Sequence, residues 1–173
     1  MRTTRVIGIV LGSVLLQVAL SRYAVGGRFS FDLVLVGVVF ASLQTGAVAG
    51  MIAGTVGGLT LDILSGTVVG FGGLLKTVVG CASGALGTQF VVAKAHARAL
   101  IVAGATLAHG LMGAGLQAVI DQTWPRMAWT AMLEQIVINT VVGWAAFLAT
   151  ESLPGALARS RSRSRSTWSR RQW

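Results

Sequence analysis

The sequence predicts an all-α membrane protein, a bundle of about six transmembrane helices. Of its 173 residues, 54% are hydrophobic and only 11% are charged, whereas a soluble domain carries about 25% charged residues. The bilayer is therefore the expected solvent, and in hydrocarbon the backbone must bond to itself, as helices or as a closed barrel. The apolar runs are continuous and lack the alternation of barrel strands, which favours helices.

Apolar runs that could cross a bilayer follow one another along the chain, each needing about 20 residues to span. The first follows the basic start MRTTR and resembles a secretory signal, but the rest of the chain is apolar too, so we expect it to remain as a helix. The second is short, either tilted or re-entrant, and forms a hairpin with the third. The expected spans are 6–23, 31–44, 46–61, 68–92, 99–120 and 127–150.

The distribution of lysine and arginine predicts the orientation of these spans. One side collects Arg2, Arg5, Lys94, Arg98 and the arginines of the C-terminal tail, and the other collects Arg22, Arg28 and Arg126. Because basic residues are enriched in cytoplasmic loops, both termini are expected in the cytoplasm. The sequence thus indicates a multi-pass protein of the cell membrane.

The C-terminal tail ends in RSRSRSTWSRRQW, a low-complexity basic sequence that cannot bury a core. We therefore divide the chain into a transmembrane bundle, residues 1–153, and a disordered basic cytoplasmic tail, residues 154–173. Such a tail is attracted to anionic lipid by about 1 kcal/mol per basic residue. Nucleic acid is not an expected partner, because the basic excess lies where any membrane protein would place it.

A glycine ladder stands in GAVAGMIAGTVGGLTLDILSG, where Gly46, Gly50, Gly54 and Gly58 recur at every fourth residue. Small residues let helix backbones approach closely in a membrane. The ladder therefore predicts a packing face for the bundle itself, for a partner's helix or for a small ligand. Because one close crossing needs only two small residues, we expect one end to pack inside the bundle and the other to be open to lipid.

Ionisable side chains inside apolar spans suggest function by default. Asp62 lies at the end of the third span, before Ser65 and Gly66, and Lys76 lies about two turns into the fourth. We expect an ion pair between Asp62 and Lys76 that joins the hairpin. Asp62 could also accept hydrogen bonds from backbone N–H groups at the start of the fourth helix, close to Gly70, and a proton or ion path would use the same residues.

The other polar residues of the spans do not form a catalytic set. His109 is expected to be a hydrogen-bonded interior residue, because no second ligand stands at metal-binding spacing. Glu134 and Asn139 could bond to another helix of the bundle or to a partner's helix. Since no nucleophile–base set, phosphate loop or metal cluster is present, we expect neither an enzyme nor a cofactor.

The region 31–80 resembles the rod-shape-determining protein MreD family. The resemblance lies in the apolar segment FDLVL, which opens with Asp32, and in the glycine-rich GLTLDILSG followed by VVGFGGLLKTVVG. Length, six spans and two cytoplasmic ends also fit the family. Phe31 stands where the family commonly has proline.

The resemblance implies a non-catalytic subunit of the cell-elongation complex in the bacterial inner membrane. Such a subunit would bind the bitopic scaffold MreC, and through it connect MreB filaments with the glycosyltransferase and transpeptidase that build peptidoglycan. The family is also similar in fold to the substrate-binding subunits of energy-coupling-factor transporters. The alternative function is therefore a subunit that binds a small solute, which would need a polar cavity.

Overall fold

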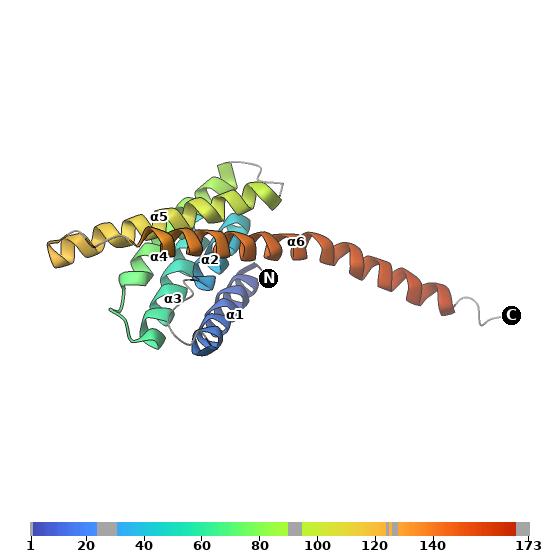
Figure 1. Ribbon diagram of the computed structural model, residues 1–173. Helices are drawn as coiled ribbons and strands as arrows, with labels where there is room; N and C mark the ends of the chain where they lie inside the picture. The colour runs from blue at the N-terminus through green and yellow to red at the C-terminus, as the bar shows by residue number, and fades with distance from the viewer. Residues whose placement is uncertain (1, 24–30, 90–94, 124, 126–127, 169–173) are drawn as a thin grey trace.

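The computed structural model is all-α within its described residues, which are all except 1, 24–30, 90–94, 124, 126–127 and 169–173, with side chains at 2–5, 22–23 and 151–168 also left aside (Figure 1). Six helices follow one another in this described part, which confirms the all-α class that the sequence predicts. They are α1 (Arg2–Tyr23), α2 (Leu33–Thr45), α3 (Ala47–Ser65), α4 (Phe71–Gln89), α5 (Ala95–Asp121) and α6 (Trp129–Trp168).

Three helical segments of the described chain are long and apolar enough to cross a membrane, which indicates a membrane protein. They are Ala47–Ser65, which is α3, Ala95–Asp121, which is α5, and Trp129–Thr150 within α6. The apolar parts of α1 (Val6–Ser21) and α2 (Leu33–Thr45) are shorter, and α4 carries Lys76 among many glycines. A crossing by all six helices stays a prediction.

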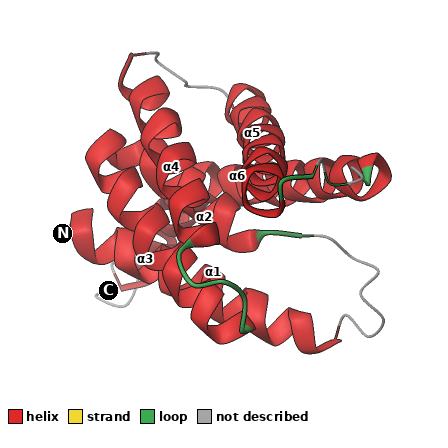
Figure 2. Cartoon of the chain, turned by 90° about the vertical axis from the view of Figure 1, so that its left-hand side faces the viewer, coloured by secondary structure: helices red, strands yellow, loops and turns green. Residues whose placement is uncertain are grey.

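The central helix is α2, the shortest of the six and the most completely buried (Figure 2). Val34, Leu35, Val38 and Val39 are fully buried, and α2 packs on every other helix. At a rise of about 1.5 Å per residue its 13 residues are far shorter than the hydrocarbon core. The first turn of α2 consequently begins inside the bundle, where its free N–H groups need protein partners.

Aromatic contacts connect α2 to the last two helices. The ring of Phe40 in α2 stacks on the ring of Phe147 in α6, with 4.8 Å between their centroids. The guanidinium of Arg98 in α5 lies 5.3 Å from the centre of the Phe147 ring, within the range of a cation–π contact. Phe147 is fully buried, so this contact fixes the point at which α6 crosses α2.

The last helix continues well beyond the bundle (Figure 1). The sequence predicts disorder from residue 154, whereas α6 extends to Trp168. Alanine and arginine are good helix formers, so a segment unable to bury a core can still continue a helix that the bundle has started. Residues 169–173 of the predicted tail lie outside the described residues.

Candidate functional site

A carboxylate caps the buried start of α2. Asp32 is the N-cap residue, and its Oδ1 accepts a hydrogen bond of 2.8 Å from the backbone N–H of Leu35. Its other oxygen, Oδ2, lies 2.7 Å from Nζ of Lys76 in α4. The two side chains are only 7% and 4% exposed. A negative charge at a helix N-terminus is favourable, and Lys76 neutralises it.

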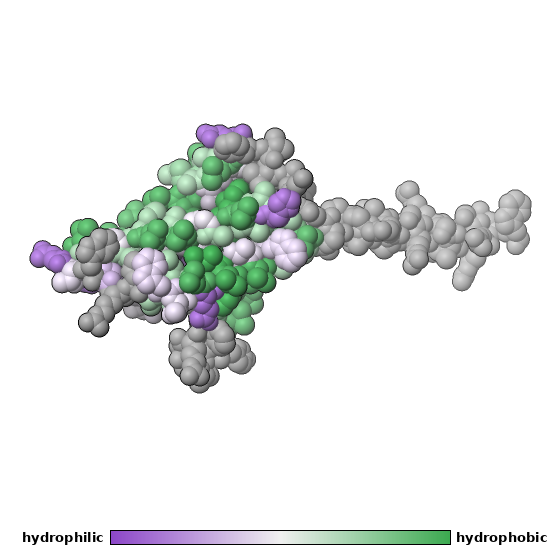
Figure 3. Space-filling view, turned by 45° about the horizontal axis from the view of Figure 1, so that its top comes forward, coloured by the Kyte–Doolittle hydropathy of each residue, from purple (hydrophilic) through white to green (hydrophobic). Residues whose placement is uncertain are grey.

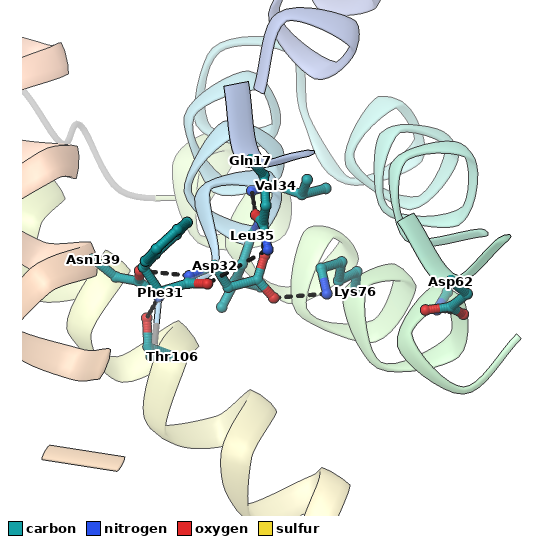
Figure 4. A network of polar contacts seen from close by, with 10 residues as sticks. Gln17, Phe31, Asp32, Val34, Leu35, Asp62, Lys76, Thr106 and Asn139 are labelled. Atoms are coloured by element: carbon teal, nitrogen blue, oxygen red, sulfur yellow. Dashed lines mark hydrogen bonds and ion pairs between the residues drawn. The ribbon is translucent and has the colours of Figure 1, made fainter. Parts of the chain in front are cut away.

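Side chains from three further helices complete this cap (Figure 4). Oε1 of Gln17 in α1 accepts from the N–H of Val34 at 3.0 Å. Oδ1 of Asn139 in α6 accepts from the N–H of Asp32 at 3.0 Å, and its Nδ2 donates to Oγ1 of Thr106 in α5 at 3.3 Å. We name Gln17, Asp32, Lys76, Thr106 and Asn139 the α2 cap cluster.

The α2 cap cluster is closed and electrically neutral. Its one carboxylate and one ammonium face each other, and both ends of the Asn139 amide are used. Asn139 is fully buried and Thr106 is 1% exposed. Burying a charge costs several kcal/mol unless a well-placed counter-charge compensates it. The cluster therefore joins α1, α2, α4, α5 and α6 at one point, as a structural junction.

The expected ion pair between Asp62 and Lys76 is wrong, because Lys76 bonds to Asp32. Asp62 Oδ2 instead accepts from the backbone N–H groups of Gly70 at 3.0 Å and Gly73 at 3.1 Å. This is the second possibility that the sequence left open, a cap on the fourth helix. Figure 4 shows Asp62 apart from the Lys76 ammonium.

The turn between α3 and α4 requires two glycines. Gly66 and Gly70 have φ values of 65° and 98°, in the left-handed region that side chains rarely adopt. Ser65, the last residue of α3, is exposed. The turn places two backbone N–H groups at the start of α4 within hydrogen-bond distance of Asp62. The predicted positions Gly66 and Gly70 therefore determine the shape of the hairpin.

The glycine ladder faces α4 along its whole length. A Cβ on Gly50 would overlap the carbonyl oxygen of Gly80, one on Gly54 that of Lys76, and one on Gly58 the backbone of Gly73. Gly46, at the first residue before α3, has Gly84 directly against it. The expectation that one end of the ladder is open to lipid is wrong, because the backbone of α4 lies against every step, with its own glycines opposite Gly46, Gly50 and Gly58.

Two predicted polar residues, His109 and Glu134, make no hydrogen bond to the α2 cap cluster within the described residues, although His109 lies near Lys76 and Asp32. Nε2 of His109 is buried and has no hydrogen-bond partner within the described residues. Glu134 is partly exposed, whereas Asn139 is fully buried in the α2 cap cluster. The two are five residues apart, about 140° around a helix, so they serve different faces. Where the chain is described, no three His, Cys, Asp or Glu side chains gather in a metal-binding group.

Asp32, Gln17 and Thr106 were not predicted as site residues. Asp32 does carry a readable signal, since an aspartate directly before an apolar run is a helix N-cap pattern. Gln17 and Thr106 are single polar residues in apolar helices. Their positions in the sequence do not predict which buried N–H or amide group they hydrogen-bond.

Two grooves open on the outer surface, which is largely apolar with hydrophilic residues mainly at its margins (Figure 3). A groove of about 350 Å³ lies between α1 and α3, and its only polar lining residue is Thr45. A second, of about 370 Å³, lies between α5 and α6. Its lining residues are His96, Ala99, Leu100, Thr140, Val141 and Trp144.

Comparison with protein-family models, curated proteins and solved structures found no match to this chain. The fold and the site by themselves define a small all-helical membrane protein whose buried ion pair lies in a closed cluster. Its interior is held together by its own side-chain contacts, and its exterior is apolar and suited to a lipid bilayer.

Proposed function

We propose that this chain is a non-catalytic membrane subunit of the cell-elongation complex, which determines rod shape through peptidoglycan synthesis. It acts by packing its helices against a bitopic partner such as MreC, and thereby serves MreB filaments and the elongation glycosyltransferase and transpeptidase indirectly. The observation that carries the proposal is the closed α2 cap cluster, whose buried carboxylate and ammonium bond to each other. The resemblance in residues 31–80 supplies the cellular context.

The chemistry of the exterior supports binding to another helix. Leu133, Val137 and Val141 of α6, and Ile52 and Val56 of α3, are between 50% and 60% exposed. Helices associate in membranes by close packing of such surfaces and by interhelical hydrogen bonds. A rigid bundle with apolar outer faces can hold a single-span partner without any chemical step.

The proposal includes a bacterial inner-membrane protein with six spans and both termini in the cytoplasm. Reporter fusions after Arg5, Arg98 and Arg159 should all give a cytoplasmic signal, and a fusion after Gln122 should give an exterior signal. An exterior signal at Arg98 would contradict this topology.

Co-purification tests the proposed function directly. The tagged chain should retain a co-expressed MreC-like scaffold in mild detergent, and should restore rod shape to a rod-shaped host that lacks its own subunit. A matched control is an MreC-like scaffold whose single span has been exchanged for an unrelated apolar helix. Equal retention of both scaffolds, or folded chain without restored shape, would contradict the proposal.

A solute-binding subunit of the energy-coupling-factor type is the second candidate. One observation favours it, namely the buried Nε2 of His109, which has no hydrogen-bond partner among the described residues and lies three residues after Thr106 on α5. A solute with a hydrogen-bonding group could bind there if the helices part. Water-soluble vitamins should then raise the midpoint of thermal unfolding in detergent, and His109→Leu should abolish the shift. The scaffold proposal expects no shift with any of them.

A further inference from the structure

A stripe along α6 has the spacing of a helix-packing seam. Glu134, Val137, Val141 and Trp144 follow at intervals of three, four and three residues, and we name these residues the α6 stripe. Val137, Val141 and Trp144 are 60%, 57% and 46% exposed. This alternation of three and four keeps residues on one helix face and is the pattern of left-handed helix pairs in water and in membranes. The stripe is thus a complete seam without a helix on it.

Within the described residues, the first residue of the stripe carries a charge without a counter-charge. Glu134 lies five residues into the apolar segment Trp129–Thr150 and has no ion pair or hydrogen bond within the part of the chain that the structure describes. Asp32 and Asp62, by contrast, both have bonded partners. A carboxylate inside an apolar segment is expected to face a cation or a donor.

The groove between α5 and α6 continues the stripe. Val141 and Trp144 belong to both, and the groove's volume of about 370 Å³ is enough for large side chains. The groove between α1 and α3 has a similar volume of about 350 Å³, and its described lining residues carry no charge. Among the residues whose side chains the structure describes, the α6 face combines a recess, a helix-pair spacing and a charge without a bonded partner.

We propose that the α6 stripe binds a single transmembrane helix of another protein, one that carries a lysine or arginine opposite Glu134. A second copy of this chain is a poorer occupant. A two-fold axis along the membrane normal would place Glu134 against Glu134, and like charges at close range repel. A lipid tail offers no donor. The inference rests on the proposed function only in that the chain binds a partner's helix.

Synthetic helices in lipid vesicles test the charge requirement without a cellular partner. The probe is a dansylated helix of about 20 leucines and alanines, with one lysine at the depth of Glu134, and its control has leucine there. Energy transfer from tryptophan to dansyl in vesicles that hold the full chain gives both affinities. We expect the lysine helix to bind about three- to twenty-fold more tightly, the range of interhelical hydrogen bonds in membranes.

Two variants of the chain sharpen the test. Glu134→Gln should remove the preference for the lysine helix, whereas Asp121→Asn, which neutralises an exposed carboxylate at the end of α5, should keep it. Val141→Phe, on the stripe, should weaken both helices, and Ile52→Phe, in the groove between α1 and α3, should weaken neither. Circular dichroism melts check that each variant is folded.

Several outcomes would overturn the inference. The inference fails if the chain binds both helices with equal affinity, or if folded Glu134→Gln keeps the full preference for the lysine helix. It also fails if further copies of the chain displace the lysine helix and so abolish the energy transfer. The result is separable from the proposed function, since a lysine preference in vesicles together with failure to restore cell shape would uphold the surface and reject the cellular role. Restored cell shape without any preference for the lysine helix would uphold the cellular role and reject the surface.

Discussion

The seam between α3 and α4 and the junction of α2 with α5 and α6 hold the same bundle together by opposite means. In the seam, glycines bring the two backbones together, so that Gly50 and Gly54 lie directly against α4, and one side-chain hydrogen bond of 2.7 Å joins Thr55 to Thr77. In the junction, the side chain of Asn139 accepts from the N–H of Asp32 at the start of α2 and donates to Thr106 in α5. The seam depends mainly on the close fit of two backbones, whereas the junction depends on specific polar partners.

This difference predicts how each region fails. The seam gains many small dispersion contacts, and any added carbon atom must displace a backbone that helical hydrogen bonds hold in place. The junction can lose one bond and leave the helices where they are, at the cost of an unsatisfied polar group. Substitutions in the seam should therefore abolish folding, and those in the junction should lower stability by graded amounts.

The largest expected effect is that of Gly54→Leu. A Cβ there overlaps the carbonyl of Lys76, so α3 and α4 must separate, at a cost above the about 1–3 kcal/mol of ordinary overpacking. We expect no monodisperse protein by size-exclusion chromatography in detergent. Gly104→Ala is the matched control, because a Cβ at Gly104 meets nothing within 4 Å. A folded Gly54→Leu would mean that the seam is looser than the structure shows.

The next effect in size is that of Lys76→Met, which leaves the Asp32 carboxylate buried without a counter-charge. Removing one member of a buried ion pair costs about 3–5 kcal/mol. Unfolding by SDS titration should show this loss, and the double variant with Asp32→Asn should recover part of it. Adding Asp62→Asn to Lys76→Met instead should give a simple sum. If Asp62→Asn restored stability to Lys76→Met and Asp32→Asn did not, Lys76 would pair with Asp62, as the sequence predicts.

A smaller effect is expected for Asn139→Ala, which deprives the N–H of Asp32 of its acceptor. A buried group left unsatisfied costs about 1–3 kcal/mol, so the same SDS titration should show a folded but less stable protein. Thr140→Ala is the control, because that hydroxyl bonds only within its own helix, to the carbonyl of Ile136. A loss in the control as large as that in Asn139→Ala would point to helix propensity rather than the junction.

The same contrast explains what the sequence could and could not predict. The ladder from Gly46 to Gly58 is a local period, so the packing face was predictable. The helix that covers this face could not be predicted, because the glycines of α4 that match the ladder do not recur at every fourth residue. The fold class and the existence of all six helices also follow from local composition.

The α2 cap cluster could not be predicted in the same way, because its bonds join residues far apart in the chain. Asp32 and Asn139 are 107 positions apart, and no periodicity relates them. Proximity in the sequence favoured Asp62 as the partner of Lys76, but Lys76 points to the other side of α4, toward α2. Asp62 had a nearer use, since the turn brings the N–H groups of α4 to it.

Asp62→Ala carries the smallest of these effects and separates a cap from a junction. Its Oδ2 accepts from the N–H groups of Gly70 and Gly73, so the substitution leaves two donors at the start of α4 without their acceptor. Loss of an N-terminal cap costs about 0.5–2 kcal/mol, less than a broken ion pair, because it leaves neutral N–H groups without an acceptor rather than a buried charge. Hydrogen exchange should therefore accelerate in the first turn of α4 while α2 keeps its protection. Asp32→Ala is the counterpart, and it should expose the first turn of α2 and lower stability throughout the bundle. If Asp62→Ala loosened α2 as well, the turn and the α2 cap cluster would be one cooperative unit, and the contrast between seam and junction would fail.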